Sequence, residues 1–347
     1  MTFTGTGRLR FNHAMSETSD IERLWRLGDL VSPMAVRVAA TLRLSDHIAA
    51  GATTLPDLAE RTASHPGTLG RLMRHLVAIG VYSQTGERYS LTGVGEAMRE
   101  GHAGNRGPLM LDLTSAVGRA HLAAVRLLES VRTGGPAYPL VHGRGFWDDL
   151  SLDAELGAGF DELMGSDGDP GAVVGLYDWT RVRHVVDVGG GKGTTLGFLL
   201  RTNPNMRGTL VELPGPAQRA RQKFEDEGLS ARATVVTGSF FDTLPAGADV
   251  YWLSAIIHDW GDADAVTILH RCVEAAGRSG KVLVAESLLD PTQELAGMSA
   301  FDLFMLICCG GRERTLDEYT ALGRQAGLSL RSVMGSTWPS LLEFVVE

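Results

Sequence analysis

The chain has 347 residues, 44% hydrophobic and 21% charged, a composition typical of soluble globular proteins and a length sufficient for two domains. Its 41 acidic and 32 basic residues give a formal net charge of −9, which argues against a nucleic-acid-binding surface. No run of eighteen apolar residues predicts a membrane span, and the three cysteines lack the spacing of a zinc site or a disulfide framework.

Residues 1–20 are polar and have no apolar segment like that of a signal peptide, so we predict that they are disordered and that the protein is cytoplasmic. Residues 21–105 begin with apolar residues at helical spacing, with Pro33 at a predicted break between two helices. Two strand-like pieces around a Thr-Gly-Glu turn follow, in VYSQTGERYSLT. Helices followed by a hairpin are the element order of a winged helix.

A winged helix either binds DNA or serves as a scaffold or dimerisation module. The candidate recognition helix RLMRHL offers only Arg71, Arg74 and His75, in a chain that is acidic overall. The residues therefore favour the scaffold or dimerisation role.

Residues 106–180 are predicted to be mostly helical, a linker with aromatic and methionine side chains suited to a core or a ligand pocket. From residue 181 to 347 the pattern changes to apolar, β-branched runs that alternate with helical segments: HVVDV, GTLVEL, ATVVTG, ADVYWLSAII and KVLVAESLL. This βαβ alternation predicts a parallel sheet in an α/β fold. The last two runs, LSLRSV and LLEFVVE, are predicted to pair antiparallel.

Ligands of open parallel sheets bind beyond the carboxyl ends of the strands. The predicted strands end in Asp187 with a glycine turn, in Glu212, in Ser239 with Phe240, in His258 with Asp259, and in Glu286. Because these ends meet at one edge of the sheet, we predict a single site there.

The glycine turn, DVGGGKGTT, departs from the dinucleotide-binding pattern GxGxxG, because Thr194 stands where the third glycine belongs. Glu212, at the end of the next strand, can accept hydrogen bonds from two ribose hydroxyls. NAD and S-adenosylmethionine both present such a ribose, so these residues alone leave both cofactors open.

Six ordered motifs are present: VVDVGGGKG, LVEL, GSFFDTLP, SAIIHDWGD, VLVAES and GGRERT. Together they resemble the S-adenosylmethionine-dependent small-molecule O-methyltransferases, the family of plant caffeate and flavonoid enzymes and of bacterial polyketide-tailoring relatives. The resemblance extends over nearly the whole chain from about residue 22. It implies a class I methyltransferase, Rossmann-like sheet with an N-terminal helical winged-helix dimerisation domain, and a homodimer.

The resemblance also implies S-adenosylmethionine as cofactor and assigns ligands to it: Asp187, Gly189, Gly191, Glu212, Ser239, Phe240 and Ser254. The glycine turn would hold the methionine moiety, with Asp187 facing its amino group. Glu212 would bind the ribose, and the last three residues would lie on the adenine side. The family usually has Asp where this chain has Ser239, which predicts looser cofactor binding.

Methyl transfer to a phenol, whose pKa is about 10, is assisted by a base that takes the hydroxyl proton. In the resembled family this base is the histidine of the HDW motif, which is His258 here. Two carboxylates flank it there and match Glu286 and Glu313; they would fix the ring and raise its pKa. The residues alone also allow a structural His258 capped by Asp259, but a buried Glu286 needs a partner and His258 is the expected one.

Four residues match the acceptor pocket of relatives: Phe160, Met164, Met305 and Cys309. A largely apolar lining suits a flat aromatic acceptor. Cys308 and Cys309 replace more polar residues of the plant relatives, which favours a polycyclic polyketide over a small phenolic acid.

Three other functions share parts of this pattern. A same-fold hydroxylase or decarboxylase of a polycyclic aromatic substrate would use the cofactor without methyl transfer, but relatives of that kind typically lack the motif histidine. Thr194 and the lack of a Ser/Tyr/Lys constellation disfavour an NAD-dependent oxidoreductase. A winged-helix regulator would not need the base and its carboxylates. The sequence thus favours methylation of a phenolic hydroxyl of an aromatic natural product and indicates no metal, nucleic-acid or membrane partner.

Overall fold

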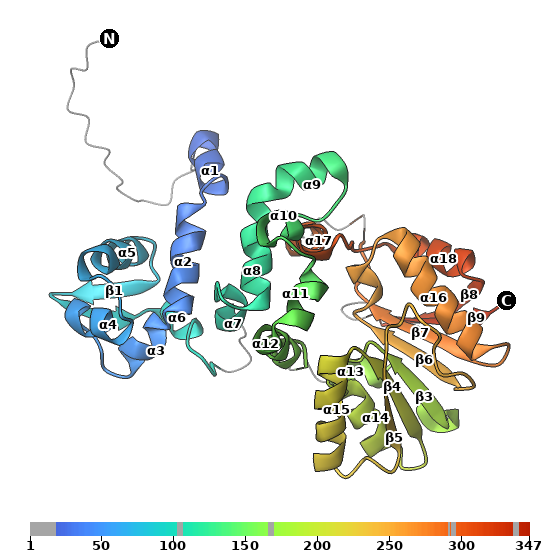
Figure 1. Ribbon diagram of the computed structural model, residues 1–347. Coiled ribbons are helices and arrows are strands. Elements are labelled where there is room, and N and C mark those ends of the chain that lie inside the picture. The colour runs from blue at the N-terminus through green and yellow to red at the C-terminus, as the bar shows by residue number, and fades with distance from the viewer. Residues whose placement is uncertain (1–18, 103–106, 166–169, 291, 293–295, 336–339) are drawn as a thin grey trace. The chain divides into compact units, whose positions relative to one another are not determined.

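The computed structural model describes residues 19–102, 107–165, 170–290, 292, 296–335 and 340–347 (Figure 1). The chain divides into two compact units, one up to Leu111 and one from Asp112 onward. The boundary predicted between residues 105 and 106 lies outside the described residues. The predicted disordered segment lies outside them as far as residue 18.

The first unit consists of short helices and a two-stranded hairpin. Its elements are α1 (Asp20–Leu27), α2 (Val31–Thr41), α3 (Leu44–Ala49), α4 (Leu55–Arg61), α5 (Pro66–Ala78), β1 (Tyr82–Thr85), β2 (Arg88–Leu91), α6 (Gly93–Ala97) and α7 (Gly107–Leu111). Gly86, with a φ of +62°, makes the tight turn of the hairpin. Leu44, Leu58 and Met73 lie in its fully buried core. The predicted helices and hairpin are confirmed.

The helix break predicted at Pro33 is wrong by a few residues. α1 ends at Leu27 and α2 begins at Val31, so Pro33 lies in the first turn of α2, where a helix needs no N–H donor. Asp29 marks the break, because its carboxylate accepts hydrogen bonds from the backbone N–H groups of Val31 (2.9 Å) and Ser32 (3.1 Å).

The second unit begins with the predicted helical segment. Its elements are α8 (Ala116–Leu122), η1 (Ala123–Arg126), α9 (Leu127–Thr133), α10 (Tyr138–His142), α11 (Phe146–Leu152), α12 (Ala154–Gly165), α13 (Pro170–Val174) and η2 (Trp179–Arg181). A buried aromatic cluster that includes Tyr138 and Phe146 joins these helices to Ile307 and Cys308 near the C-terminal end of the chain. This segment and the predicted catalytic domain are therefore packed together in one unit.

A mixed sheet follows, of seven strands within the described residues, in the order β5-β4-β3-β6-β7-β9-β8. Its strands are β3 (His184–Val188), β4 (Arg207–Glu212), β5 (Ala233–Thr237), β6 (Val250–Ser254), β7 (Lys281–Glu286), β8 (Leu328–Met334) and β9 (Ser340–Val346). The helices between them are α14 (Thr194–Thr202), α15 (Pro214–Asp226), η3 (Ile257–Asp259), α16 (Asp262–Ala276), α17 (Ala296–Cys309) and α18 (Leu316–Gln325). Strand β9 runs antiparallel to both of its neighbours, and the other pairs are parallel. The predicted parallel strands and the antiparallel C-terminal pair are confirmed.

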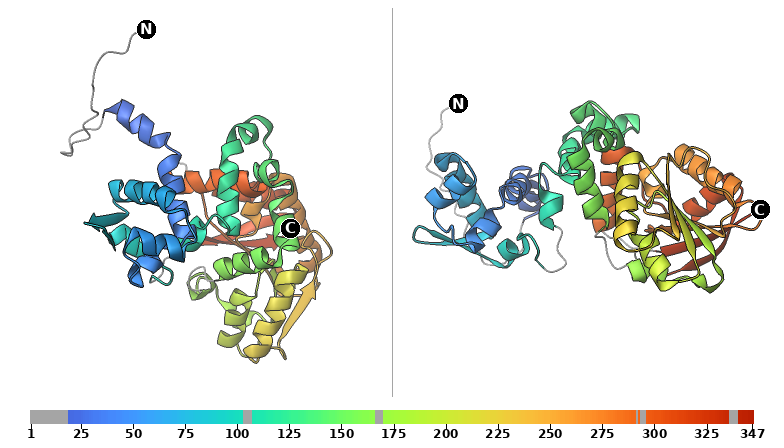
Figure 2. Two further views of the ribbon diagram at one scale, coloured as in Figure 1. Left: turned by 60° about the vertical axis from the view of Figure 1, so that its left-hand side comes forward. Right: turned by 60° about the horizontal axis from the view of Figure 1, so that its bottom comes forward.

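Helices cover both faces of this sheet (Figure 2). Alternate side chains of a strand point to opposite faces, so Val186 and Leu253 pack with α16 and α18, while Val185 and Trp252 pack with α14 and α15. The strand order reverses between β3 and β6. Ligands of such sheets bind at this reversal point, and the glycine turn after β3 lies there.

Candidate active site

The glycine turn after β3 brings its backbone close to neighbouring groups. Gly189, Gly191 and Gly193 all have φ values between +57° and +74°, which only glycine adopts without strain. A Cβ at Gly189 would lie 2.7 Å from the Cδ1 atom of Ile256, and one at Gly193 would overlap the ring of Phe224. Nothing lies within 4 Å of the corresponding position at Gly191, so this part of the turn faces open space.

Two carboxylates lie beside the turn, the buried Asp187 and the partly buried Glu212, and neither forms an ion pair with another described residue. Glu212 accepts hydrogen bonds from the backbone N–H groups of Gly191 (3.3 Å) and Leu213. The Oδ2 atom of Asp187 is buried and has no hydrogen-bond partner among the described residues. Burial raises the pKa of both carboxyl groups to about 7, and the charge of Glu212 contributes to the rise at Asp187.

These carboxylates fit the cofactor implied by the sequence. The unpartnered Oδ2 atom of Asp187 is costly to bury, and a ligand amino group would satisfy it, while the oxygens of Glu212 have further lone pairs for ribose hydroxyls. Asp187 and Glu212 would hold those two groups of S-adenosylmethionine, while the open side of Gly191 leaves room for a ligand.

Of the residues predicted for the adenine side, Phe240 packs against the turn. The prediction that Ser239 and Phe240 end a strand is wrong, because β5 ends at Thr237. The ring of Phe240 would be 3.2 Å from a Cβ at Gly189, so it packs directly against the glycine backbone. Ser239 accepts a hydrogen bond from the backbone N–H of Phe241 at 3.1 Å, which leaves its hydroxyl proton free to be donated. Ser254 is the last residue of β6.

The prediction that His258 ends a strand is wrong. β6 ends at Ser254, and His258 lies four residues further on, in the 3₁₀ turn η3. The strand stops because Ala255 has a φ of +52°, a left-handed conformation that is costly for a residue with a Cβ. Glu286 compensates for this, since its Oε1 atom accepts hydrogen bonds from the backbone N–H groups of Ile256 (3.1 Å), Ile257 (2.7 Å) and His258 (3.3 Å).

Carboxylates surround the imidazole of His258, whose side chain is only 8% exposed. Its Nδ1 atom lies 2.8 Å from Oε1 of Glu313 and 3.7 Å from Oε2 of Glu286. Its Nε2 atom lies 3.6 Å from Oδ1 of Asp259. The structure therefore brings together the three residues predicted as catalytic, but Glu286 bonds mainly to backbone and Glu313 makes the hydrogen bond to the ring.

This environment controls the charge of the ring. Burial alone would lower the pKa of His258, but the charges of Glu286 and Asp259 and the hydrogen bond to Glu313 outweigh it and raise the pKa to about 10. Burial raises the pKa of Asp259 to about 7. With Glu313 accepting a hydrogen bond from Nδ1–H, a neutral His258 presents an unprotonated Nε2 as the proton acceptor.

The predicted acceptor-pocket residues occupy two helices. Met305 and Cys309 lie one turn apart on α17, where the Cys309 thiol donates to the carbonyl oxygen of Met305 at 3.5 Å. The neighbouring thiol of Cys308, burial and the charge of Asp259 hold the pKa of Cys309 well above its usual range, so this cysteine lies near the His258 turn. On α12, Phe160 packs against the cluster that contains Cys308, whereas Met164 is 40% exposed.

Sequence reasoning missed some side chains near His258. The ring of Phe301 on α17 lies 6.0 Å from the imidazole. Phe304 stacks on Phe301, and its ring centroid lies 4.5 Å from that of His121. The helical spacing of the run FDLFM places Phe301 and Phe304 on one face of α17 with Met305. From this spacing the two phenylalanines could have been predicted from the sequence. Within the described ranges, no cluster of histidine, cysteine and carboxylate side chains is arranged to bind a metal ion.

Comparison with known families shows to which family the chain belongs. Residues 125–329 match the model of an O-methyltransferase domain, and residues 25–100 match that of an O-methyltransferase dimerisation domain. The chain belongs to the S-adenosylmethionine-dependent O-methyltransferase family. The predicted family, fold class, enzyme class and cofactor are confirmed.

Individual relatives are similar over almost their whole length. The chain is 49% identical to 2,7-dihydroxy-5-methyl-1-naphthoate 7-O-methyltransferase of Streptomyces carzinostaticus, over 91% of this chain and 95% of the relative. It is 48% identical to aclacinomycin 10-hydroxylase RdmB of Streptomyces purpurascens, over 92% of this chain and 89% of the relative. The crystal structure of NcsB1, an O-methyltransferase from neocarzinostatin biosynthesis in complex with S-adenosylmethionine and 2-hydroxy-5-methyl naphthoic acid, matches with a TM-score of 0.89 and 48% identity. That match covers 93% of this chain and 98% of NcsB1.

Among the residues that the structure describes, every helix is too short or too polar to span a membrane.

Proposed function

We propose that this enzyme methylates a phenolic hydroxyl of a polyketide-type aromatic acceptor, with His258 as the general base. The pair formed by His258 and Glu313, 2.8 Å apart, is the observation that supports this proposal most directly. Bound S-adenosylmethionine supplies an electrophilic methyl group. The acceptor oxygen would bond to the methyl carbon as the methyl–sulfur bond breaks, which would leave S-adenosylhomocysteine. Nε2 of His258 would take the hydroxyl proton, and Glu313, Glu286 and Asp259 would stabilise the resulting imidazolium.

The acceptor class follows from the lining and from the relatives. Aromatic and apolar side chains on α12 and α17 suit a flat ring system, in which apolar faces supply affinity and a few polar groups set the orientation. The relative with 49% identity is named for a dihydroxynaphthoate, and NcsB1 was crystallised with a hydroxynaphthoic acid. We therefore expect a hydroxylated bicyclic or polycyclic aromatic acceptor.

Because the chain is also similar to a 10-hydroxylase, the first experiment determines which reaction the enzyme catalyses. The purified enzyme is incubated with S-adenosylmethionine and a panel of hydroxynaphthoates, anthracyclines and simple phenols, and products are weighed by mass spectrometry. We expect a gain of one methylene unit on a polycyclic acceptor with equimolar S-adenosylhomocysteine. A product that gains oxygen or loses carbon dioxide while the cofactor is unspent would instead support the hydroxylase or decarboxylase alternative.

The matched dimerisation domain leads us to propose a homodimer whose contacts include α1. Four large apolar side chains of this helix are strongly exposed within the single chain: Ile21 (68%), Leu24 (67%), Trp25 (75%) and Leu27 (76%). A helix with an apolar face of this size is normally covered. The polar face carries Glu22, Arg23 and Arg26.

Leu24→Asp is expected to convert the dimer to a monomer, because it places a charge in the apolar contact. Arg23→Asp, the same new side chain on the polar face, is the matched control and should leave the mass unchanged. Size-exclusion chromatography with light scattering measures both. A dimer that survives Leu24→Asp would show that α1 is not part of the interface.

A further inference from the structure

Residues 310–315 lie against the turn that carries His258, and only Glu313 among them has a part in the proposed chemistry. Gly311 permits this close approach, because a Cβ there would overlap the backbone of His258 and Asp259. The backbone N–H of Arg312 donates to the carbonyl oxygen of His258 at 2.8 Å. The two segments are therefore joined along their backbones, and the side chain of the next residue but one, Arg314, completes the contact.

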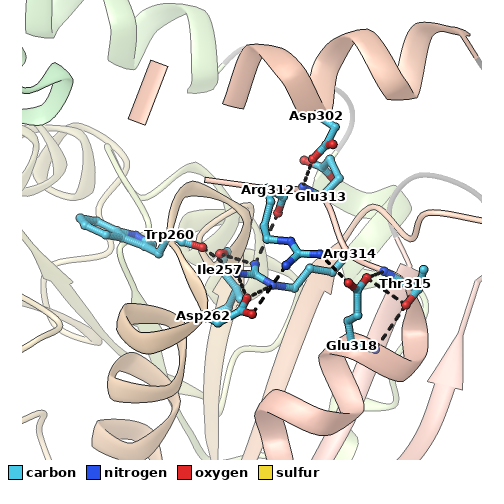
Figure 3. A network of polar contacts seen from close by, with 9 residues as sticks. All are labelled: Ile257, Trp260, Asp262, Asp302, Arg312, Glu313, Arg314, Thr315 and Glu318. Atoms are coloured by element: carbon cyan, nitrogen blue, oxygen red, sulfur yellow. Dashed lines mark hydrogen bonds and ion pairs between the residues drawn. The ribbon is translucent and has the colours of Figure 1, made fainter. Parts of the chain in front are cut away.

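Arg314 is fully buried and makes five hydrogen bonds (Figure 3). Its Nε and Nη2 atoms donate to Oδ1 of Asp262 at 3.1 and 2.8 Å. Nη2 also donates to the carbonyl oxygen of Trp260 at 2.7 Å, and Nη1 to those of Ile257 (3.1 Å) and Arg312 (3.4 Å). A guanidinium has five N–H donors, so this buried cation is satisfied.

Two oppositely charged groups hold the His258 turn from its two sides. Glu286 accepts hydrogen bonds from its backbone N–H groups, as described above. Arg314 donates to the carbonyl groups of Ile257 and Trp260, which lie immediately before and two residues after His258. Since Ala255 introduces strain just upstream, the turn depends on these contacts for its position.

Arg314 also follows Glu313 directly in the chain. Asp302 accepts a hydrogen bond from the backbone N–H of Glu313 at 2.8 Å (Figure 3). This segment is therefore held in place at both Glu313 and Arg314. We propose that Arg314 is a positioning residue that holds the His258 turn and Glu313 in register, so that the imidazole and the carboxylate stay within hydrogen-bonding distance. This inference rests on the proposed role of His258 as the base.

A lysine cannot reproduce this arrangement. Its ammonium group donates from one nitrogen atom. The three nitrogen atoms of the planar guanidinium instead reach Asp262 and two separate carbonyl groups at the same time. Arg314→Lys keeps the charge and shifts the turn. Because misplacement of about 1 Å can cost about 10²-fold in rate, we expect kcat to fall by about that factor.

The test is a double-mutant cycle between Arg314→Lys and His258→Ala, with kcat, the Kd for S-adenosylmethionine and the unfolding midpoint measured for each protein. We expect Arg314→Lys to lower kcat in the wild type but to cause no further loss in His258→Ala. The Kd should stay unchanged, because none of the partners of Arg314 is a proposed cofactor ligand. Arg201→Lys, at the ion pair with Glu227 on the surface, is the control and should keep full activity.

Asp262→Asn provides a milder second variant, because this side chain is 58% exposed and the amide keeps an oxygen that can accept from the guanidinium. It should lower kcat in the same direction and again only when His258 is present. Equal losses of kcat in both backgrounds, or no loss at all, would overturn the positioning role. A His258→Ala protein with the wild-type rate would overturn the proposed base itself, whatever the arginine variants do.

Discussion

Replacement of His258 by alanine is expected to lower kcat by about 10²–10⁴-fold at a pH at which the imidazole is neutral, the usual contribution of general-base catalysis. Activity should persist at a low level, because holding the acceptor in line with the methyl donor contributes a larger part of the rate, about 7–11 kcal/mol. Production of S-adenosylhomocysteine with a saturating acceptor measures the loss. Glu274→Gln, an exposed side chain on α16, is a control remote from the His258 cluster.

The pH dependence distinguishes a base from a packing residue. A base must be neutral, and the carboxylates that surround His258 raise its pKa to about 10, so kcat/KM should rise with pH up to that pKa. Glu313→Gln removes the hydrogen-bonded carboxylate, which lowers the pKa of His258 and moves the rising limb to lower pH. This shift should be absent when Glu313→Gln is combined with His258→Ala.

Free imidazole offers an independent check, because His258→Ala leaves a buried space lined by the three carboxylates. Partial recovery of the rate with added imidazole would support proton transfer at this position. A rate that neither falls in His258→Ala nor shifts in Glu313→Gln would remove both residues from the mechanism.

The sheet and the location of the site could be predicted because they depend on local patterns. Apolar β-branched runs predicted β3 to β9, and the rule that ligands bind at strand ends placed Asp187, Glu212 and Glu286 at one edge. The family motifs then paired His258 with Glu313, two residues 55 positions apart that the structure brings to 2.8 Å.

The turn that carries His258 could not be predicted in the same way. Its shape depends on the left-handed backbone of Ala255, which no alanine propensity indicates, and on a carboxylate from β7 that binds backbone rather than the ring. The proposed role of Arg314 depends on a close approach of two segments that are distant in the sequence. Gly311, which permits this approach, is the one residue type there that indicates it. Side-chain contacts to backbone carbonyl groups leave no periodic signal in a sequence.

Glu212→Gln is expected to weaken binding of S-adenosylmethionine and to stabilise the cofactor-free protein, two effects of opposite sign. Hydrogen bonds to a charged group contribute about 1.5–3 kcal/mol, so loss of the carboxylate should raise the Kd by about 10–150-fold. In the cofactor-free protein the same carboxylate is buried at a cost, which the neutral amide removes. Isothermal titration calorimetry and thermal unfolding measure the two effects.

The sign of the pH effect follows from the pKa. Burial raises the pKa of Glu212 from 4.5 to about 7 in the folded state, so the folded protein binds this proton more tightly than the unfolded chain does. Stability of the cofactor-free wild type should therefore fall as pH rises between these two values, and the penalty stays constant above the upper one. Glu212→Gln should be the more stable protein at about pH 9, with a difference that shrinks towards about pH 5. Glu225→Gln, a change at an exposed side chain of the neighbouring helix α15, should leave the stability equal to that of the wild type at both pH values.

Comparison of two ligands shows what Glu212 recognises. S-adenosylmethionine and S-adenosylhomocysteine carry the same ribose, but only the first has a positively charged sulfur. If Glu212 binds the ribose hydroxyls, Glu212→Gln weakens both ligands by the same factor, because the lost hydrogen bonds are common to them. A loss confined to S-adenosylmethionine would mean that the carboxylate acts through its charge on the sulfonium, and an unchanged Kd for both would remove Glu212 from the cofactor site.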